Sequence, residues 1–225
     1  PYALGDIHDR VAGLVQAFMP GEEGAAAIAG VLSGRVQPGA KLPVQIPRLP
    51  GSQPGTYLQP VLGAENSGVS NLDPTPLYPF GFGSSYTTFA VDDLRISAGE
   101  VPTDGEFTVT ARVRNTGERA GDEVVQLYLR DVVGQVTRPV KQLTGFARVP
   151  LEAGEAKDVT FTVHTDRISF TGRDLTRIVE PGEIEVLVGT SAADLPCRGT
   201  VTLTGPVRPT GRDRVLTTPV EVQKA

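Results

Sequence analysis

The chain has 225 residues, with 21 basic and 26 acidic side chains and a net charge of −5 at pH 7. This acidic balance argues against nucleic acid or an anionic membrane as its main partner. A single cysteine, Cys197, excludes an internal disulfide. With only two histidines, His8 and His164, the composition indicates no metal site and no cofactor. No apolar run approaches the 18 residues of a membrane-spanning helix.

The start of the chain indicates a piece of something longer. It begins with Pro1, and its only methionine is Met19. We therefore expect a fragment or a processed product. A leader sequence would lie outside it, so cytoplasmic and secreted locations both remain open.

Residues 1–47 have the pattern of an incomplete α/β unit. The apolar run 11–19 predicts a buried strand. An alanine-rich helix follows over 22–32, with a predicted apolar stripe at Ile28, Val31 and Leu32. A short strand at 42–46 completes a unit too small to form a doubly wound sheet.

Residues 48–85 show little periodicity and read as a connector. Eight prolines fall between Pro43 and Pro79. The aromatic end of the connector, residues 77–83, is expected to pack against another part of the protein.

From residue 86 the apolar period changes to two, which is typical of strands with one buried face. Glycine and proline make up a fifth of the chain, which also favours turn-rich β structure. Without a Cys…Trp…Cys set, about seven strands over 86–205 predict a fibronectin type III-like variety of the immunoglobulin-like sandwich. Residues 206–225 are polar and expected to fray. The seven predicted strands are 89–96, 107–114, 125–130, 140–149, 159–164, 184–188 and 201–204.

The densest polar cluster, in Gly5-Asp-Ile-His-Asp-Arg10, has two interpretations. Asp6, His8 and Asp9 could form a metal or acid–base site, or they could belong to a solvated loop. The loop is favoured, because one histidine beside nearby carboxylates is a nonspecific pattern.

Other polar groups offer no catalytic arrangement. Glu22 and Glu23 would point about 100° apart on a helix, whereas a glycosidase pair faces a shared substrate, so helix-dipole complementation is the better account. Asp73 is expected to form an Asx turn. The segment 81–85 lacks the lysine of a phosphate loop, and Cys197 is expected to be an inert core residue.

Several ordered stretches together resemble glycoside hydrolase family 3, and the match extends to about residue 204. Residues 1–47 are similar to the end of that family's second domain, and 73–87 to its bridge into a fibronectin type III-like domain. The stretches that carry the resemblance are Ala17–Gly24, Ala27–Gly34, Gly39–Pro43, Asp73–Gly83, Ser85–Thr87, Gly121–Tyr128, Arg138–Leu143 and Glu180–Gly182.

The resemblance implies retaining exo-β-glycosidases that act on β-glucosides or β-xylosides. In that family the nucleophile is an aspartate on an N-terminal (β/α)8 barrel, and the acid–base glutamate lies in the second domain, upstream of the segment matched here. The resemblance therefore assigns no catalytic residue to this chain. The expected partners are the barrel and the rest of the α/β domain, with a β-linked glycoside as substrate and homodimerisation left open.

The sequence thus predicts a mainly β chain: an α/β remnant at 1–47, a connector at 48–85, a sandwich at 86–205 and a tail at 206–225. In some relatives, loops near this junction border the pocket, so Asn66, Asn71 and Asp73 are the predicted substrate contacts.

Two other functions remain open. A non-catalytic carbohydrate-binding or protein-interaction module would need an exposed aromatic platform, for which Tyr128 is the one outward candidate in a strand. Alternatively, the chain could belong to a two-chain enzyme whose partner supplies both carboxylates.

Overall fold

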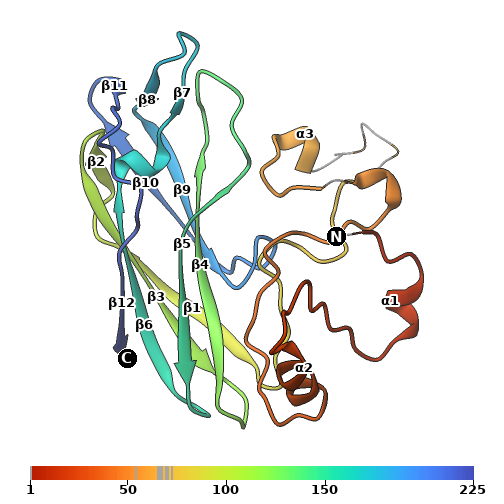
Figure 1. Cartoon of the computed structure of the whole chain (residues 1–225). Helices are drawn as coiled ribbons and strands as arrows, with labels where there is room; N and C mark the ends of the chain where they lie inside the picture. The colour runs from red at the N-terminus through yellow and green to blue at the C-terminus, as the bar shows by residue number, and fades with distance from the viewer. Residues whose placement is uncertain (1, 54, 65–67, 69–70, 72) are drawn as a thin grey trace.

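The computed structural model describes residues 2–53, 55–64, 68, 71 and 73–225. These form a β-sandwich with an irregular N-terminal segment lying along one side (Figure 1). One sheet has the order β1-β3-β6-β12 and the other the order β2-β10-β9-β4-β5. The first sheet consists of β1 (Phe89–Ile96), β3 (Glu106–Asn115), β6 (Ala156–His164) and β12 (Val220–Lys224). The second consists of β2 (Glu100–Pro102), β10 (Cys197–Thr204), β9 (Gly182–Gly189), β4 (Gly121–Asp131) and β5 (Gln142–Leu151).

A small third sheet closes one end of the sandwich. Its order is β11-β8-β7, and the 3₁₀ helix η2 (Thr165–Ile168) leads into it from β6. The strands are β7 (Phe170–Thr171), β8 (Arg177–Val179) and β11 (Arg208–Pro209).

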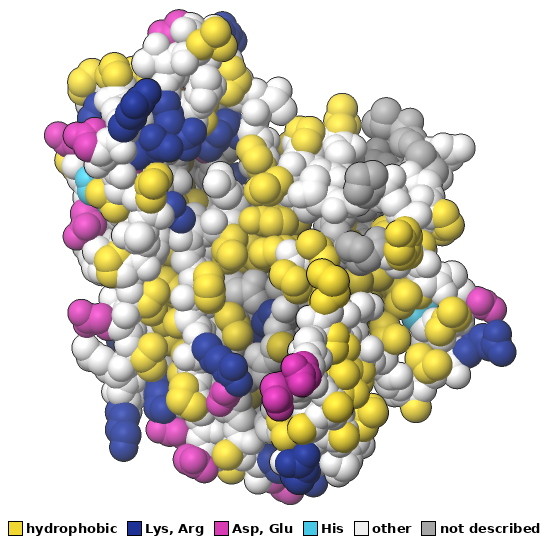
Figure 2. All heavy atoms as spheres, in the orientation of Figure 1, with side chains coloured by type: hydrophobic (Ala, Val, Ile, Leu, Met, Phe, Trp, Pro, Cys, Tyr) yellow, Lys and Arg dark blue, Asp and Glu magenta, His cyan; other side chains and the backbone are white. Residues whose placement is uncertain are grey.

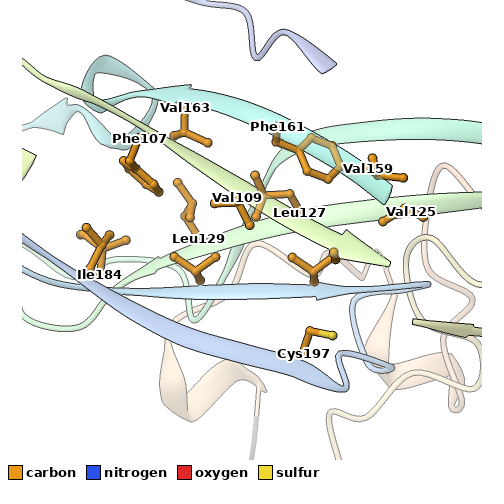
Figure 3. Packing of buried hydrophobic residues seen from close by; sticks show 14 of the residues in the cluster. Phe107, Val109, Val125, Leu127, Leu129, Val159, Phe161, Val163, Ile184 and Cys197 are labelled. Carbon is orange, nitrogen blue, oxygen red and sulfur yellow. The ribbon is translucent and has the colours of Figure 1, made fainter. Parts of the chain in front are cut away.

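Alternating apolar residues fill the space between the two large sheets (Figure 3). On β3, Phe107, Val109, Ala111 and Val113 are buried, and the residues between them face outward. Because strand side chains alternate between faces, this periodicity determines which side of the sheet meets the core. The same core includes Phe161 and, as expected for an inert residue, the buried thiol of Cys197.

The fold confirms the sandwich prediction. Every one of the seven predicted strands overlaps an observed strand, and 89–96 matches β1 in both bounds. The very short strands β2, β7, β8 and β11 were missed, since two or three residues carry no readable period.

The N-terminal segment differs from its prediction. Its helices are α1 (Ile7–Arg10) and α2 (Gly24–Leu32), followed by η1 (Pro50–Ser52) and α3 (Val61–Ala64). Residues 11–19 form no strand and are mostly exposed, because no described segment pairs with them. Instead of a strand over 42–46, there is one antiparallel bridge between Ile46 and Tyr78.

Helix α2 lies where the sequence predicts a helix, but it does not bury the predicted apolar stripe. Gly24 and Gly30 are its buried residues, while Leu32 is 68% exposed. Glu23 occupies the N-cap position without a side-chain cap bond, and Glu22 precedes it. The two carboxylates therefore lie before the first turn rather than within it.

The polar tail does not fray as expected. Two of its segments pair with the sandwich, β11 with β8 and β12 with β6. Buried Asp166 anchors the tail at two points, accepting hydrogen bonds from Arg208 Nη2 of β11 at 2.5 Å and from Val215 N, between β11 and β12, at 2.9 Å. The tail is thus part of the folded unit.

This anchor makes a pH-dependent contribution to stability. Burial raises the pKa of Asp166, but the bonds from Arg208 and Val215 outweigh it and hold the pKa below its ordinary value. The stabilisation is complete above the ordinary aspartate pKa and is lost as the pH falls through the lowered folded value. We predict that Asp166→Asn costs about 2 kcal/mol at pH 7 by chemical denaturation, because Arg208 loses its charged partner.

The difference between wild type and Asp166→Asn should shrink as the pH falls below about 4, the ordinary aspartate pKa, and on through the lower pKa of Asp166 in the folded chain. Asp104→Asn, at an exposed position, is the control and should change stability little. A constant difference from pH 7 to pH 3 would contradict this account.

Candidate functional site

The connector covers the outer face of the second sheet. Tyr57 and Phe80 stack at 4.2 Å between ring centroids, and Tyr57 meets Tyr128 of β4 edge-on at 6.0 Å. Tyr128 is fully buried there, and burial raises its pKa. The Tyr57 hydroxyl also accepts a hydrogen bond from Leu143 N at 3.2 Å. We call Tyr57, Phe80 and Tyr128 the aromatic clamp.

Buried Gln126 of β4 forms hydrogen bonds with the connector, with the loop after β9 and with Tyr128 of the clamp. Its Nε2 donates to Gly81 O at 3.1 Å and to Thr190 O at 2.6 Å, and its Oε1 accepts from the Tyr128 hydroxyl at 2.6 Å. Ala192 N adds a backbone bond to Phe80 O at 2.9 Å. The connector is therefore held in one register on the sheet.

A buried ion pair joins the N-terminal segment to the same strand. Lys41 Nζ lies 2.7 Å from Glu123 Oε1, and the two side chains are 13% and 8% exposed. Lys41 Nζ also donates to Gly83 O at 3.3 Å. Removing either charge would leave the other buried and unpaired, which is costly.

Sequence reasoning found only part of this contact. The aromatic end 77–83 does pack as expected, and Phe80 carries that packing. Tyr128 was correctly expected to point out of the core, but the prediction that it is exposed is wrong, because the connector covers it. The contributions of Tyr57 and Gln126 to this contact were not predicted, because the connector has no periodicity that would indicate which strand it packs against.

Two of the three predicted substrate contacts, Asn71 and Asp73, lie within the described residues. Asn66 lies outside the described residues. Asn71 is exposed, and Asp73 is exposed with its Oδ1 accepting a hydrogen bond from Thr75 N at 2.9 Å. This is the expected Asx turn, and the bond to Thr75 holds the pKa of Asp73 below its usual value.

The polar cluster at 6–10 lies on the exposed helix α1. His8 Nε2 is 3.1 Å from Asp9 Oδ1, and Arg10 pairs with Asp6 at 3.6 Å one turn away. Within the described part of the chain, no three histidine, cysteine or acidic side chains are grouped as metal ligands. No helix of that part is long and apolar enough to cross a membrane.

The N-terminal segment also exposes many large apolar side chains. Figure 2 shows yellow side chains extending over this part of the surface. Large exposed apolar patches mark sites of interaction with proteins, membranes or ligands, or aggregation-prone surfaces. We call it the apolar face; its most exposed members are Tyr2 (83%), Met19 (96%), Leu32 (68%) and Leu62 (71%).

Two family models match the chain. The glycosyl hydrolase family 3 C-terminal domain matches residues 1–86, and the fibronectin type III-like domain matches residues 123–192. The boundary of the first match coincides with the end of the connector.

Relatives match over most of this chain and a small part of their own length. A β-xylosidase of Formosa agariphila is 38% identical over 85% of this chain and 27% of its own. A periplasmic β-glucosidase of Salmonella typhimurium is 37% identical over 86% and 26%. The solved β-glucosidase of Listeria innocua in complex with glucose has a TM-score of 0.81 and 33% identity, covering 89% of this chain and 29% of its own. The chain thus spans little more than a quarter of these proteins.

The contact at Gly81 provides a direct test of connector docking. Gly81 has φ +78°, and a Cβ there would overlap Gln126 Oε1. We predict that Gly81→Ala costs about 2–4 kcal/mol, from backbone strain and overpacking together, measured by chemical denaturation.

Gly34→Ala is the matched control, because Gly34 has φ +73° and nothing within 4 Å of an added Cβ. It should cost only about 1 kcal/mol from backbone strain. Equal costs for the two variants would show that the contact with Gln126 contributes nothing.

Proposed function

This chain belongs to glycosyl hydrolase family 3 and matches the C-terminal part of its proteins; on that premise we propose that it is the structural C-terminal region of an exo-β-glycosidase. The proposed parent is a retaining enzyme that hydrolyses terminal β-D-glucosyl or β-D-xylosyl residues. Relatives named β-xylosidase and β-glucosidase support these two substrate classes.

The proposed role of the chain is structural. A retaining mechanism needs one carboxylate as nucleophile and another as acid–base, facing each other across about 5 Å. The acidic groups of the described part of the N-terminal segment are exposed: Asp6 pairs with Arg10, Asp9 lies beside His8, and Asp73 accepts a hydrogen bond within a local turn. We therefore place both catalytic carboxylates on other parts of the parent enzyme.

The observation that carries this proposal is the apolar face. We propose that the rest of the α/β domain and the (β/α)8 barrel cover it, since fully burying one such side chain contributes about 1.5–3 kcal/mol. In this proposal the aromatic clamp joins the packed N-terminal segment to the sandwich. In this proposed division, residues 1–47 complete the α/β domain and residues 48–85 connect it to the sandwich. Residues 86–205 form the sandwich, and residues 206–225 add strands to it.

Substrate contact by Asn66, Asn71 and Asp73 remains a proposal, and so does homodimerisation. A stand-alone binding module with a stacking platform at Tyr128 is not supported, because that ring is buried under Tyr57 and Phe80. A two-chain enzyme would use the same apolar face and differs only in how the polypeptides are produced.

We predict that the purified chain does not hydrolyse aryl β-glucosides or aryl β-xylosides. Co-expressed with the N-terminal part of a family 3 relative, cut where the match to this chain begins, it should co-purify and restore turnover. Turnover by the chain alone would contradict the structural role.

Variants of the apolar face sharpen this test. Met19→Glu and Leu62→Glu should weaken association at least tenfold, because each places a charge in a contact that excludes water. Leu175→Glu, at an 85% exposed position on the β7–β8 turn, should not. An equal effect of all three variants would remove the apolar face from the proposal.

A further inference from the structure

Arginine side chains gather at the end of the sandwich that carries β7, β8 and β11. Figure 2 shows them as a dark blue group at the upper left, where Figure 1 places these strands. They come from the β4–β5 loop, η2, the β7–β8 turn, β8, β11 and the tail. We call Arg167, Arg173, Arg177 and Arg214 the arginine group.

Two further arginines at this end already have counter-charges. Arg138 Nε lies 3.4 Å from Asp131 Oδ2, and Arg208 pairs with Asp166. Within the described residues, no member of the arginine group makes such an ion pair. The positive charge of the group is therefore not cancelled at contact distance.

Neutral groups hold these guanidinium groups in place. Arg167 donates to Leu216 O at 2.6 Å and Thr144 O at 3.0 Å, and Arg177 Nη2 donates to Ser169 O at 2.7 Å. Hydrogen bonds to carbonyl oxygens fix a guanidinium without neutralising it. The result is a preorganised positive surface.

The tail that carries Arg214 runs beside Arg177, since Thr210 N donates a hydrogen bond to Arg177 O at 2.8 Å. Burial lowers the pKa of Arg177, and the neighbouring Arg214 lowers it further. Arginine stays protonated under such conditions, so the repulsion is retained. Arg214 Nε is buried and, among the described residues, has no hydrogen-bond partner. Two adjacent, partly desolvated cations without a carboxylate favour an anionic ligand between them.

Two of the nearby carboxylates are engaged elsewhere. Glu180 accepts from Gln135 N and Gln135 Nε2, and Asp174 accepts from Thr176 N. Neither forms an ion pair with the arginine group within the described structure. An external carboxylate would therefore face little competition from these side chains.

We propose that the arginine group binds the carboxylates of an acidic, uronate-containing polysaccharide. The choice of a glycan rests on the proposed glycosidase function, and the choice of an acidic one rests on the arginine geometry. A guanidinium offers two parallel donors to one carboxylate, which suits discrete uronate groups. A nucleic acid would offer the guanidinium groups phosphates in place of carboxylates, and the test below includes it as a competing outcome.

The test is affinity electrophoresis of the full 225-residue chain through gels containing polygalacturonate, unsubstituted xylan or double-stranded DNA. We expect retardation by polygalacturonate alone. In Arg177→Gln/Arg214→Gln the apparent affinity should fall at least tenfold, and raising the salt from 0.05 to about 0.5 M should weaken wild-type binding.

Arg130→Gln/Arg148→Gln is the matched control, since it removes the same charge from arginines paired with Glu185 and Asp122 on the second sheet. Exposed Arg173→Gln provides a single variant with little risk to folding and should weaken binding severalfold. No retardation, equal retardation by DNA, or an equal loss in the control would each overturn the proposal. None of these outcomes bears on catalysis by the parent, which the co-expression assay measures separately.

Discussion

The structure depends on the stacking of Tyr57 and Phe80 over Tyr128. A sheet in a two-layer sandwich ordinarily buries one face and presents the other to water. Strand β4 is buried on both faces, since consecutive residues Leu127 and Tyr128 belong to two different apolar clusters. The docked connector completes that arrangement, because Tyr57 and Phe80 cover part of the apolar cluster that contains Tyr128 and Leu187. The connector is thus a structural layer of the protein, and the N-terminal segment is positioned through it.

The sequence predicted those strands that show a clear two-residue apolar period between turn residues. The alternation along β3 and β6 determines which side chains fill the core, so the sandwich could be predicted closely. The apolar run at 11–19 was misassigned because a strand needs a partner, and the described chain offers it none. The tail was misassigned for the opposite reason: its pairing with β6 and its anchor at Asp166 are long-range contacts that a polar local sequence does not reveal.

The same distinction applies to the functional surfaces. An Asx turn at Asp73 is a local feature, and the sequence predicted it. The clamp and the arginine group each combine residues far apart in the chain, such as Tyr57 with Tyr128 and Arg177 with Arg214. The fold separates two surfaces: the apolar face belongs to the N-terminal segment along one side of the sandwich, and the arginine group lies at the end that carries β7, β8 and β11. The proposed division of labour within a family 3 enzyme follows from that separation.

Native-state hydrogen exchange tests the central claim most directly. The amide hydrogens of Ala192 and Leu143 donate to Phe80 O and the Tyr57 hydroxyl, so they report on connector docking. If the connector is a structural layer, both should be protected nearly as strongly as the amides of β3 and β6, and Tyr57→Ala should remove that protection while β3 and β6 keep theirs. Exchange of Ala192 and Leu143 at the rates of an open loop in the wild-type chain, with β3 and β6 still protected, would contradict the account.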